Sequence, residues 1–304
     1  MSTALLALLT APTFITLDFP GATRTAGFGT NGQGTIVGDF TSDKNGGEVP
    51  GWVLSQGAFT EIQFPGATFT RPIAVNDSGD AVGYYSDAKS SKLHGFLLSG
   101  GAFSPIDVPD ADMTEALGID AGGGVLGAYC DTGKSCDVIA NGAGTFLKGD
   151  THGFLLSGGV FQAIDVPGAL RTEAWKRNGS GRILGRYAGP DGLFHLFLLG
   201  DGIFTSIDFP GAAETAPSWY SISGGLNDAG DIVAVYCSFA PCDFTGFGFA
   251  PGQVHGFILS GGVFTTVDFP GATTTGAYGL NANGDVVGVY LGPTGEHGFL
   301  RTGR

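Results

Sequence analysis

Acidic and basic side chains at equivalent positions of a repeated segment are the first candidates for chemistry. Three glutamates, Glu115, Glu173 and Glu214, can supply a general acid and a general base if their side chains converge at the mouth of one pocket. Arg71 and Arg171 can each hold a carboxylate or sulfate through paired hydrogen bonds. These five residues predict a catalytic site for a polysaccharide, either a glycoside hydrolase or a lyase acting on an anionic chain.

Aromatic and cationic residues beside these positions predict the ligand contacts. Trp175 lies in the segment Ala-Trp-Lys-Arg-Asn, where the other repeats approximate the pattern Ala-x-Gly-Ile-Asn. Lys176 and Arg177 reverse the local charge of an acidic protein, although simple solvation explains such residues equally well. Aromatic rings would stack on the apolar faces of sugars. The remaining predicted ligand contacts are Trp219, Tyr220, Tyr278, Phe28 and Arg24.

A cluster of carboxylates is the candidate metal site. Asp110, Asp112 and Glu115 form the pattern D-x-D-x-x-E, and oxygen-rich clusters of this kind can hold Ca²⁺. A solvated acidic loop is the competing interpretation, because the spacing of a complete calcium loop is missing. We therefore predict no cofactor and keep Ca²⁺ only as an alternative.

The composition excludes two classes of partner. The chain has 28 acidic and 14 basic residues and a formal charge of −14, which is unsuited to binding nucleic acid through phosphates. No segment approaches the roughly 20 apolar residues that a membrane span requires. Charged residues make up 14% of the chain and glycine accounts for 55 of its 304 residues, a composition typical of an all-β protein.

An internal repeat specifies the architecture. The phrase F-x-x-I-D-F-P-G-A recurs six times, and its Pro-Gly-Ala elements follow one another at 43–45 residues, with two enlarged intervals of 58 and 60. Such a period is typical of four-stranded propeller blades. The copies begin at Phe14, Phe59, Phe103, Phe161, Phe204 and Phe264.

Each repeat divides into four strands, which predicts a six-bladed β-propeller of antiparallel blades. Asn-Asp-Ser-Gly-Asp at residues 76–80 is a hairpin turn between the first and second strands. The chain begins with a fourth strand and ends with a third, so we expect the N-terminal strand to pair into the C-terminal blade. We expect one propeller domain over residues 13–304. Residues 1–12 are either a remnant of a signal peptide or a degenerate third strand that competes with His297–Leu300, and we favour the C-terminal segment.

All five histidines occupy one repeat position, at the start of the third strand. Blade one lacks this His and also has Phe40 where the other blades carry Tyr. The joint loss predicts a hydrogen bond from Tyr to imidazole within each blade rather than a metal site. The repeated Asp of the I-D-F phrase is expected to be a turn or edge group.

The four cysteines fall in two local pairs, Cys130 with Cys136 and Cys237 with Cys242. Two short loops without a leftover thiol predict two disulfides, and hence secretion into a periplasmic or extracellular space. Each pair lies in an enlarged loop between second and third strands, at 130–151 and 237–254. These loops share a face of the propeller with the starts of the first strands, so we expect the site there, near blades three to five.

The phrase H-G-F-L-L-S-G-G-x-F-x-x-I-D-F-P-G-A resembles the bacterial extracellular repeats known as the HAF family, over residues 13–300. Blade one departs from it, with Pro50-Gly51-Trp52 in place of His-Gly-Phe. The resemblance implies secretion and a repeat architecture, and it implies no reaction.

Two functional classes remain open from the sequence. The first is a secreted, monomeric propeller that binds or cleaves an extracellular carbohydrate. The second is a non-catalytic binding or adhesion scaffold. A pocket for a hydrophobic small molecule is a third candidate, because the loop of blade five is rich in Phe.

Overall fold

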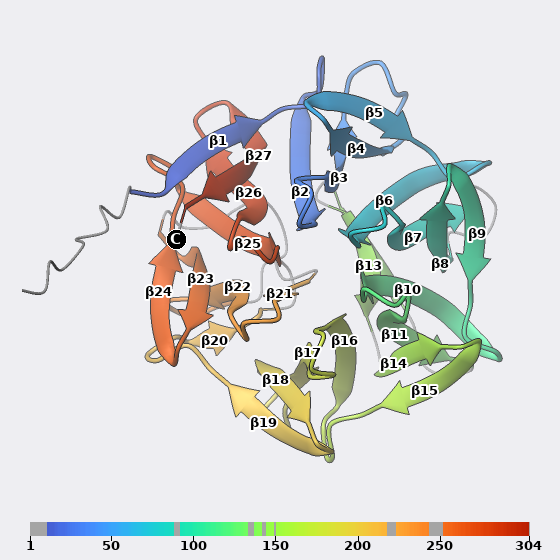
Figure 1. The fold of residues 1–304 in the computed structure, drawn as a ribbon, viewed down its shortest axis with the longest axis vertical. Helices are drawn as coiled ribbons and strands as arrows, with labels where there is room; N and C mark the ends of the chain where they lie inside the picture. Colours follow the sequence, from blue (N-terminus) through green and yellow to red (C-terminus); the bar gives the residue numbers. More distant parts are fainter. Residues whose placement is uncertain are drawn as a thin grey trace, which may run out of the picture.

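The computed structural model describes residues 11–87, 92–132, 137–141, 144–148, 150–217, 223–242 and 252–303. These residues form β-strands and no helix, and the strands make six sheets arranged as blades around a central axis. Figure 1 shows the ring viewed along this axis, with the blades following one another in chain order. The fold is a six-bladed β-propeller, as the repeat predicted.

Each blade is an antiparallel sheet whose first strand lies nearest the axis. Blade one contains β2 (Arg24–Thr30), β3 (Ile36–Thr41), β4 (Gly51–Ser55) and β5 (Ala58–Ile62). Blade two contains β6 (Ala67–Val75), β7 (Ala81–Asp87), β8 (Leu93–Ser99) and β9 (Ala102–Ile106). Blade three contains β10 (Ala111–Ile119), β11 (Val125–Asp131), β14 (Thr151–Ser157) and β15 (Val160–Ile164). Blade four contains β16 (Arg171–Arg177), β17 (Ile183–Ala188), β18 (Phe194–Gly200) and β19 (Ile203–Ile207).

The last blade closes the ring with strands from both ends of the chain. Blade six contains β25 (Thr274–Leu280), β26 (Val286–Gly292), β27 (Gly295–Thr302) and β1 (Thr13–Leu17). β1 pairs antiparallel with β27, with Ile15 opposite Leu300. The prediction that His297–Leu300 belongs to the third strand is confirmed, and residues 1–10 lie outside the described residues.

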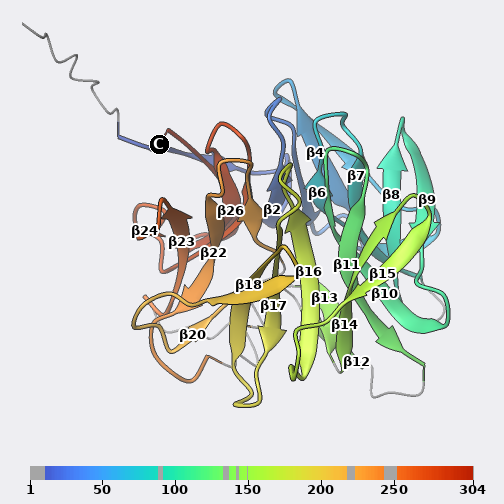
Figure 2. The same cartoon turned by 60° about the horizontal axis from the view of Figure 1, so that its bottom comes forward.

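Two blades depart from the regular pattern. Blade three carries an additional hairpin of β12 (Asp137–Asn141) and β13 (Gly144–Lys148) between its second and third strands. In blade five the first strand is interrupted, so that β20 (Glu214–Thr215) and β21 (Gly225–Leu226) both pair with β22 (Ile232–Cys237). β23 (Val254–Ser260) and β24 (Val263–Val267) complete that blade. Figure 2 shows the hairpin of blade three at the lower side of the ring.

The blades pack against one another through a repeated aromatic residue. The Phe of each His-Gly-Phe element is fully buried, as Phe154 illustrates, and Trp52 takes this place in blade one. In five of the blades the neighbouring second strand has glycine at this point, and blade five has Ala234. A Cβ on Gly127 would lie 2.0 Å from the carbonyl oxygen of Glu115 and 2.6 Å from the ring of Phe154. The glycine of the V-G-x-Y phrase thus lets first, second and third strands approach closely.

Candidate functional site

A bulge in the first strand directs one large side chain of nearly every blade into the central channel. In blades one, two, three, four and six the pairing register shifts at the third residue from the end of the strand. These residues are all nearly inaccessible and close the channel at mid-height. They are Phe28, Ile73, Leu117, Trp175 and Tyr278.

A cavity of about 340 Å³ lies on one side of this closure. It is lined by the turns that join first to second strands, and we call the corresponding side of the ring the turn face. The opposite side, which carries the hairpin of β12 and β13, is the insertion face. The turn face is toward the viewer in Figure 1 and upward in Figure 2, where β16 points toward it.

A ring of asparagines builds the wall of the cavity. Oδ1 of Asn31 accepts the backbone N–H groups of Gln33 and Thr35, which fixes the turn. Its Nδ2 donates to the carbonyl oxygen of Asn76 in the next blade at 2.8 Å. The same link joins Asn281 to Asn31 at 3.0 Å and Asn178 to Asn227 at 3.2 Å. The side chains therefore hold both the turn within a blade and the boundary between blades.

Blade three breaks this ring, because Asp120 replaces Asn and has no amide to donate. Oδ1 of Asp120 still accepts the N–H groups of Gly122 and Gly124. Hydrogen bonds still cross the boundary between blades three and four, but here the donors belong to blade four and the acceptors to blade three. Arg177 Nη1 donates to Asp120 Oδ2 at 3.3 Å, and Lys176 Nζ donates to the carbonyl oxygen of Ile119 at 3.1 Å. The two predicted ligand contacts Lys176 and Arg177 therefore line the cavity.

Charges of both signs meet in this cavity. Burial lowers the pKa of Lys176, while the carboxylates of Asp120, Asp77 and Asp228 oppose that shift. Asp77 and Asp228 accept the N–H groups of Gly32 and Gly179 at 2.8 and 2.6 Å. The lining thus combines carboxylates, amides and two cations over an apolar floor, a set suited to a small polar molecule with several hydroxyl groups.

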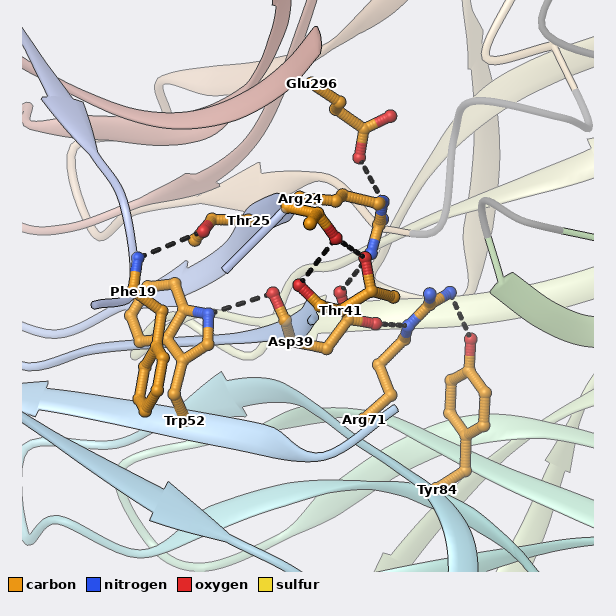
Figure 3. A network of polar contacts seen from close by, with 10 residues as sticks. Phe19, Arg24, Thr25, Asp39, Thr41, Trp52, Arg71, Tyr84 and Glu296 are labelled. Carbon is orange, nitrogen blue, oxygen red and sulfur yellow. Dashed lines mark hydrogen bonds and ion pairs between the residues drawn. The ribbon is translucent and has the colours of Figure 1, made fainter. Parts of the chain in front are cut away.

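Most of the predicted catalytic residues lie near the insertion face, at the other end of the first strands. Figure 3 shows Arg71 and Arg24 bound to the same carboxylate of Asp39. Arg71 Nε is 2.6 Å from Asp39 Oδ2, and both side chains are completely buried. Arg24 lies between Asp39 and Glu296, each at 2.7 Å. The structure therefore brings Arg24 and Arg71 together in an internal ion cluster.

Aromatic rings complete the surroundings of Arg71. The guanidinium group lies 5.1 Å from the ring centroid of Phe28 and 5.0 Å from that of Phe69. Its Nη1 donates to the hydroxyl of Tyr84 at 3.4 Å, and burial raises the pKa of that phenol. Cation, carboxylate and rings form a packed unit between blades one and two.

Glu173 is bound to Arg186 of the same blade. Its two carboxylate oxygens accept hydrogen bonds from Nη2 and Nε of Arg186 at 2.8 and 2.9 Å. Trp175 Nε1 donates to the same carboxylate at 3.2 Å. Both carboxylate oxygens of Glu173 are therefore engaged by donors of its own blade. The catalytic role of Glu173 stays a prediction.

Two other predicted residues near the insertion face, Glu214 and Arg171, lie beside Phe194, and Arg171 also interacts electrostatically with Glu173 and Arg186. Glu214 accepts the N–H group of Phe194 at 2.9 Å, and the Arg171 guanidinium lies 5.8 Å from the ring centroid of Phe194. Glu115 is buried. Trp219 and Tyr220 lie outside the described residues. Of the predicted aromatic contacts that the structure describes, Phe28, Trp175 and Tyr278 are buried in the channel closure rather than exposed for stacking.

The acidic cluster of blade three does not gather into a metal site. Asp112 pairs with Lys92, Glu115 is buried, and Asp110 adopts a positive φ of 65°. Among the residues that the structure describes, no group of three or more His, Cys, Asp or Glu side chains is placed to hold a metal ion.

One predicted disulfide is present, between Cys237 and Cys242. Cys136, the predicted partner of Cys130, lies outside the described residues. Within the described part of the chain, no helix is long and apolar enough to cross a membrane.

The histidines form a repeated pair that differs from the predicted one. Imidazole Nδ1 is 2.8–3.1 Å from the Asp of the I-D-F phrase thirteen residues later, and His255 with Asp268 is one example. The Tyr ring stacks on the imidazole, with centroids 5.1 Å apart for Tyr236 and His255, and the Tyr236 hydroxyl bonds to Thr266. The expected bond from Tyr to imidazole is therefore replaced by stacking, and the repeated Asp is the partner of His.

The comparisons with known proteins bear on the fold alone. No family model and no curated protein matches the sequence. The β-propeller domain of the Trilobed protease from Pyrococcus furiosus is similar in structure, with a TM-score of 0.54, 11% identity, and coverage of 92% of this chain and 95% of that one. A mutant of the Aleuria aurantia lectin, in complex with alpha-methyl-L-fucoside, gives 0.51 and 13%, with coverage of 94% and 93%.

A puromycin-hydrolyzing peptidase from Mycobacterium tuberculosis is also similar, with a TM-score of 0.52 and 12% identity over 95% of this chain. The present chain spans only 53% of that peptidase. At these identities the likeness establishes a shared propeller fold and transfers no activity.

Proposed function

We propose that the protein is an extracellular propeller that binds a small carbohydrate in the channel-mouth cavity of the turn face. The observation that carries this proposal is the lining itself, in which amides, carboxylates and two cations surround a volume of about 340 Å³. Hydroxyl groups of a sugar both donate and accept hydrogen bonds, so a mixed lining of this kind can satisfy them. The volume falls at the lower end of the range for ligand pockets, which suits a monosaccharide or a short oligosaccharide.

Binding is favoured over cleavage by the state of the predicted catalytic groups. Glu173 is held by Arg186, and Arg71 is held by Asp39, so neither side chain is presented to a ligand. In the cavity, Asp77 and Asp228 already accept backbone N–H groups from the preceding blades. Carboxylates fixed in this way can still accept hydrogen bonds from the hydroxyl groups of a ligand.

An extracellular location is supported by the disulfide between Cys237 and Cys242, since such bonds persist in oxidising compartments. The resemblance of the repeat to HAF proteins supports the same location. A fold likeness to a lectin that binds a fucoside is compatible with a glycan ligand.

A panel of methyl glycosides, neutral and acidic, tests the proposal by ligand-observed NMR and calorimetry. We expect saturable binding of at least one glycoside with one site per chain, and no product by mass spectrometry after prolonged incubation. Absence of binding across the panel would contradict the proposed function. Release of methanol or of unsaturated sugar would instead favour the catalytic alternative and return attention to the insertion face.

A further inference from the structure

Lys176 occupies a position where the other repeats have no side chain larger than a methyl group. The equivalent residue in the other five blades is Gly or Ala, because it packs against the backbone of the next blade. A Cβ on Gly118 would lie 1.7 Å from the carbonyl oxygen of Trp175, and one on Gly29 would lie 2.5 Å from that of Ile73. The equivalent residues are Gly29, Ala74, Gly118, Gly225 and Gly279.

Blade five provides the space that Lys176 requires. Its first strand is interrupted, and the residues beside Lys176 in the channel include Gly224 and Gly225, which have no side chains. Lys176 lines both the mouth cavity and the narrow part of the channel below it. The amine is therefore placed at the boundary between the mouth cavity and the apolar closure.

The surroundings of the amine favour its neutral form more than those of a surface lysine. Burial lowers the pKa of Lys176, and the groups that oppose this shift are Asp120 of blade three, Asp77 of blade two and Asp228 of blade five. Asp120 is itself paired with Arg177, which reduces its pull on the lysine proton. The Ile119 carbonyl accepts one N–H at 3.1 Å and so orients the nitrogen. A neutral amine keeps that bond and has a lone pair left for nucleophilic attack.

We propose that Lys176 is a carbonyl-reactive amine, and that the cavity captures small polyhydroxy aldehydes, including the open-chain form of a reducing sugar, as an imine on Lys176. The lone pair of Nζ attacks the aldehyde carbon and forms a C–N bond, giving a carbinolamine. Loss of the former carbonyl oxygen as water then yields the imine, with both hydrogens of the amine leaving in that water. The step consumes no oxidant or reductant and is reversible.

Reductive trapping tests this directly. The full chain is incubated with D-glyceraldehyde and sodium cyanoborohydride, which reduces the imine to a stable secondary amine, and labelled peptides are quantified between pH 5.5 and 9. Lys44 and Lys92 are internal controls, since Lys44 is exposed and the Lys92 side chain is 45% exposed. A lowered pKa leaves more of the amine neutral at a fixed pH, so we expect Lys176 to be labelled faster than Lys44 at pH 6.5, with the ratio falling at higher pH.

Labelling of Lys176 at or below the rate of Lys44 at pH 6.5 would overturn the proposal. The inference uses the same cavity as the proposed function, but the two fail separately. A methyl glycoside has no free aldehyde, so its binding without preferential labelling would leave the carbohydrate site intact and remove the reactive amine. Preferential labelling of Lys176 without binding of any glycoside would support the reactive amine and contradict the proposed carbohydrate site.

Discussion

Arg177 and Asp120 form an ion pair across the boundary between blades four and three, with 3.3 Å between Nη1 and Oδ2. The equivalent boundaries on either side of blade one are joined by Asn side chains, from Asn281 to Asn31 and from Asn31 to Asn76. The replacement of Asn by Asp in blade three and the two basic residues of blade four are therefore one structural departure, and together they place opposite charges in the cavity.

Substitution of Asp120 separates the role of its Oδ1 from that of its charge. Asp120→Asn restores the residue of the repeat and keeps the acceptor for Gly122 and Gly124, so we expect a change in unfolding free energy within about 1 kcal/mol. Asp120→Ala leaves two N–H groups without their acceptor, and we expect a loss of about 1–3 kcal/mol. Urea denaturation measures both. Equal losses in the two variants would contradict the assignment.

The fold was predictable because each repeat carries its own strand boundaries and turns. The half-blades at the two ends of the chain also required β1 to pair with β27, as observed. The partner of His was predictable as well, because blade one lacks Tyr, His and the Asp together, having Phe40, Pro50 and Gln63. A prediction from the Tyr and the His alone pairs these two residues, whereas the structure pairs the His with the Asp.

The position of the cavity was not predictable from strand alternation. In blade four a bulge in the first strand shifts the alternation by one residue, so Lys176 and Trp175 lie near the same channel although they are adjacent in sequence. Burial of Arg71 depends on Asp39, which belongs to another blade and is absent from the repeat pattern. The Asn residues predicted the hairpin turns. Their hydrogen bonds to neighbouring blades depend on how closely the blades approach one another, which the sequence pattern does not give.

Glu173→Gln distinguishes a structural carboxylate from a catalytic one. The substitution removes the charge that balances Arg186, which is buried, so we expect a loss of about 3 kcal/mol in unfolding free energy. Glu61→Gln, at an exposed position of β5, is the matched control and should change stability by less than about 0.5 kcal/mol. A Glu173→Gln variant as stable as the control would show that the pair with Arg186 contributes little.

Acid sensitivity should depend on Asp39. Burial raises the pKa of Asp39, but the charges of Arg71 and Arg24 outweigh that effect and hold it below its usual value of 3.8. A lowered pKa contributes stability above the unfolded-state value, and this contribution is lost as the pH falls through and below 3.8. The stability difference between the wild type and Asp39→Asn should therefore shrink between pH 5 and pH 2 in chemical denaturation. A difference that is constant with pH would refute this.

The pair of His255 and Asp268 should have the opposite pH dependence. The hydrogen bond with Asp268 raises the pKa of His255 above 6.5. The pair therefore stabilises the fold below pH 6.5, and its contribution disappears as the pH rises through the folded-state pKa. The energy is below about 1 kcal/mol, because the pair is partly exposed. NMR titration of the imidazole should give a midpoint above 6.5, and Asp268→Asn should lower it; an unchanged midpoint would argue against the assignment.

Occupation of the channel mouth is the central claim, and a blocking variant tests it most directly. Ala282 is exposed in the turn of blade six and lines the cavity, so Ala282→Trp fills the mouth without entering the core. Ala58→Trp places the same ring on the exposed start of β5, at the outer strand of blade one, as the control. For any methyl glycoside that binds the wild type, calorimetry should show at least about tenfold weaker binding to Ala282→Trp and unchanged binding to Ala58→Trp. Unchanged affinity in Ala282→Trp would place the ligand elsewhere on the molecule and contradict the account.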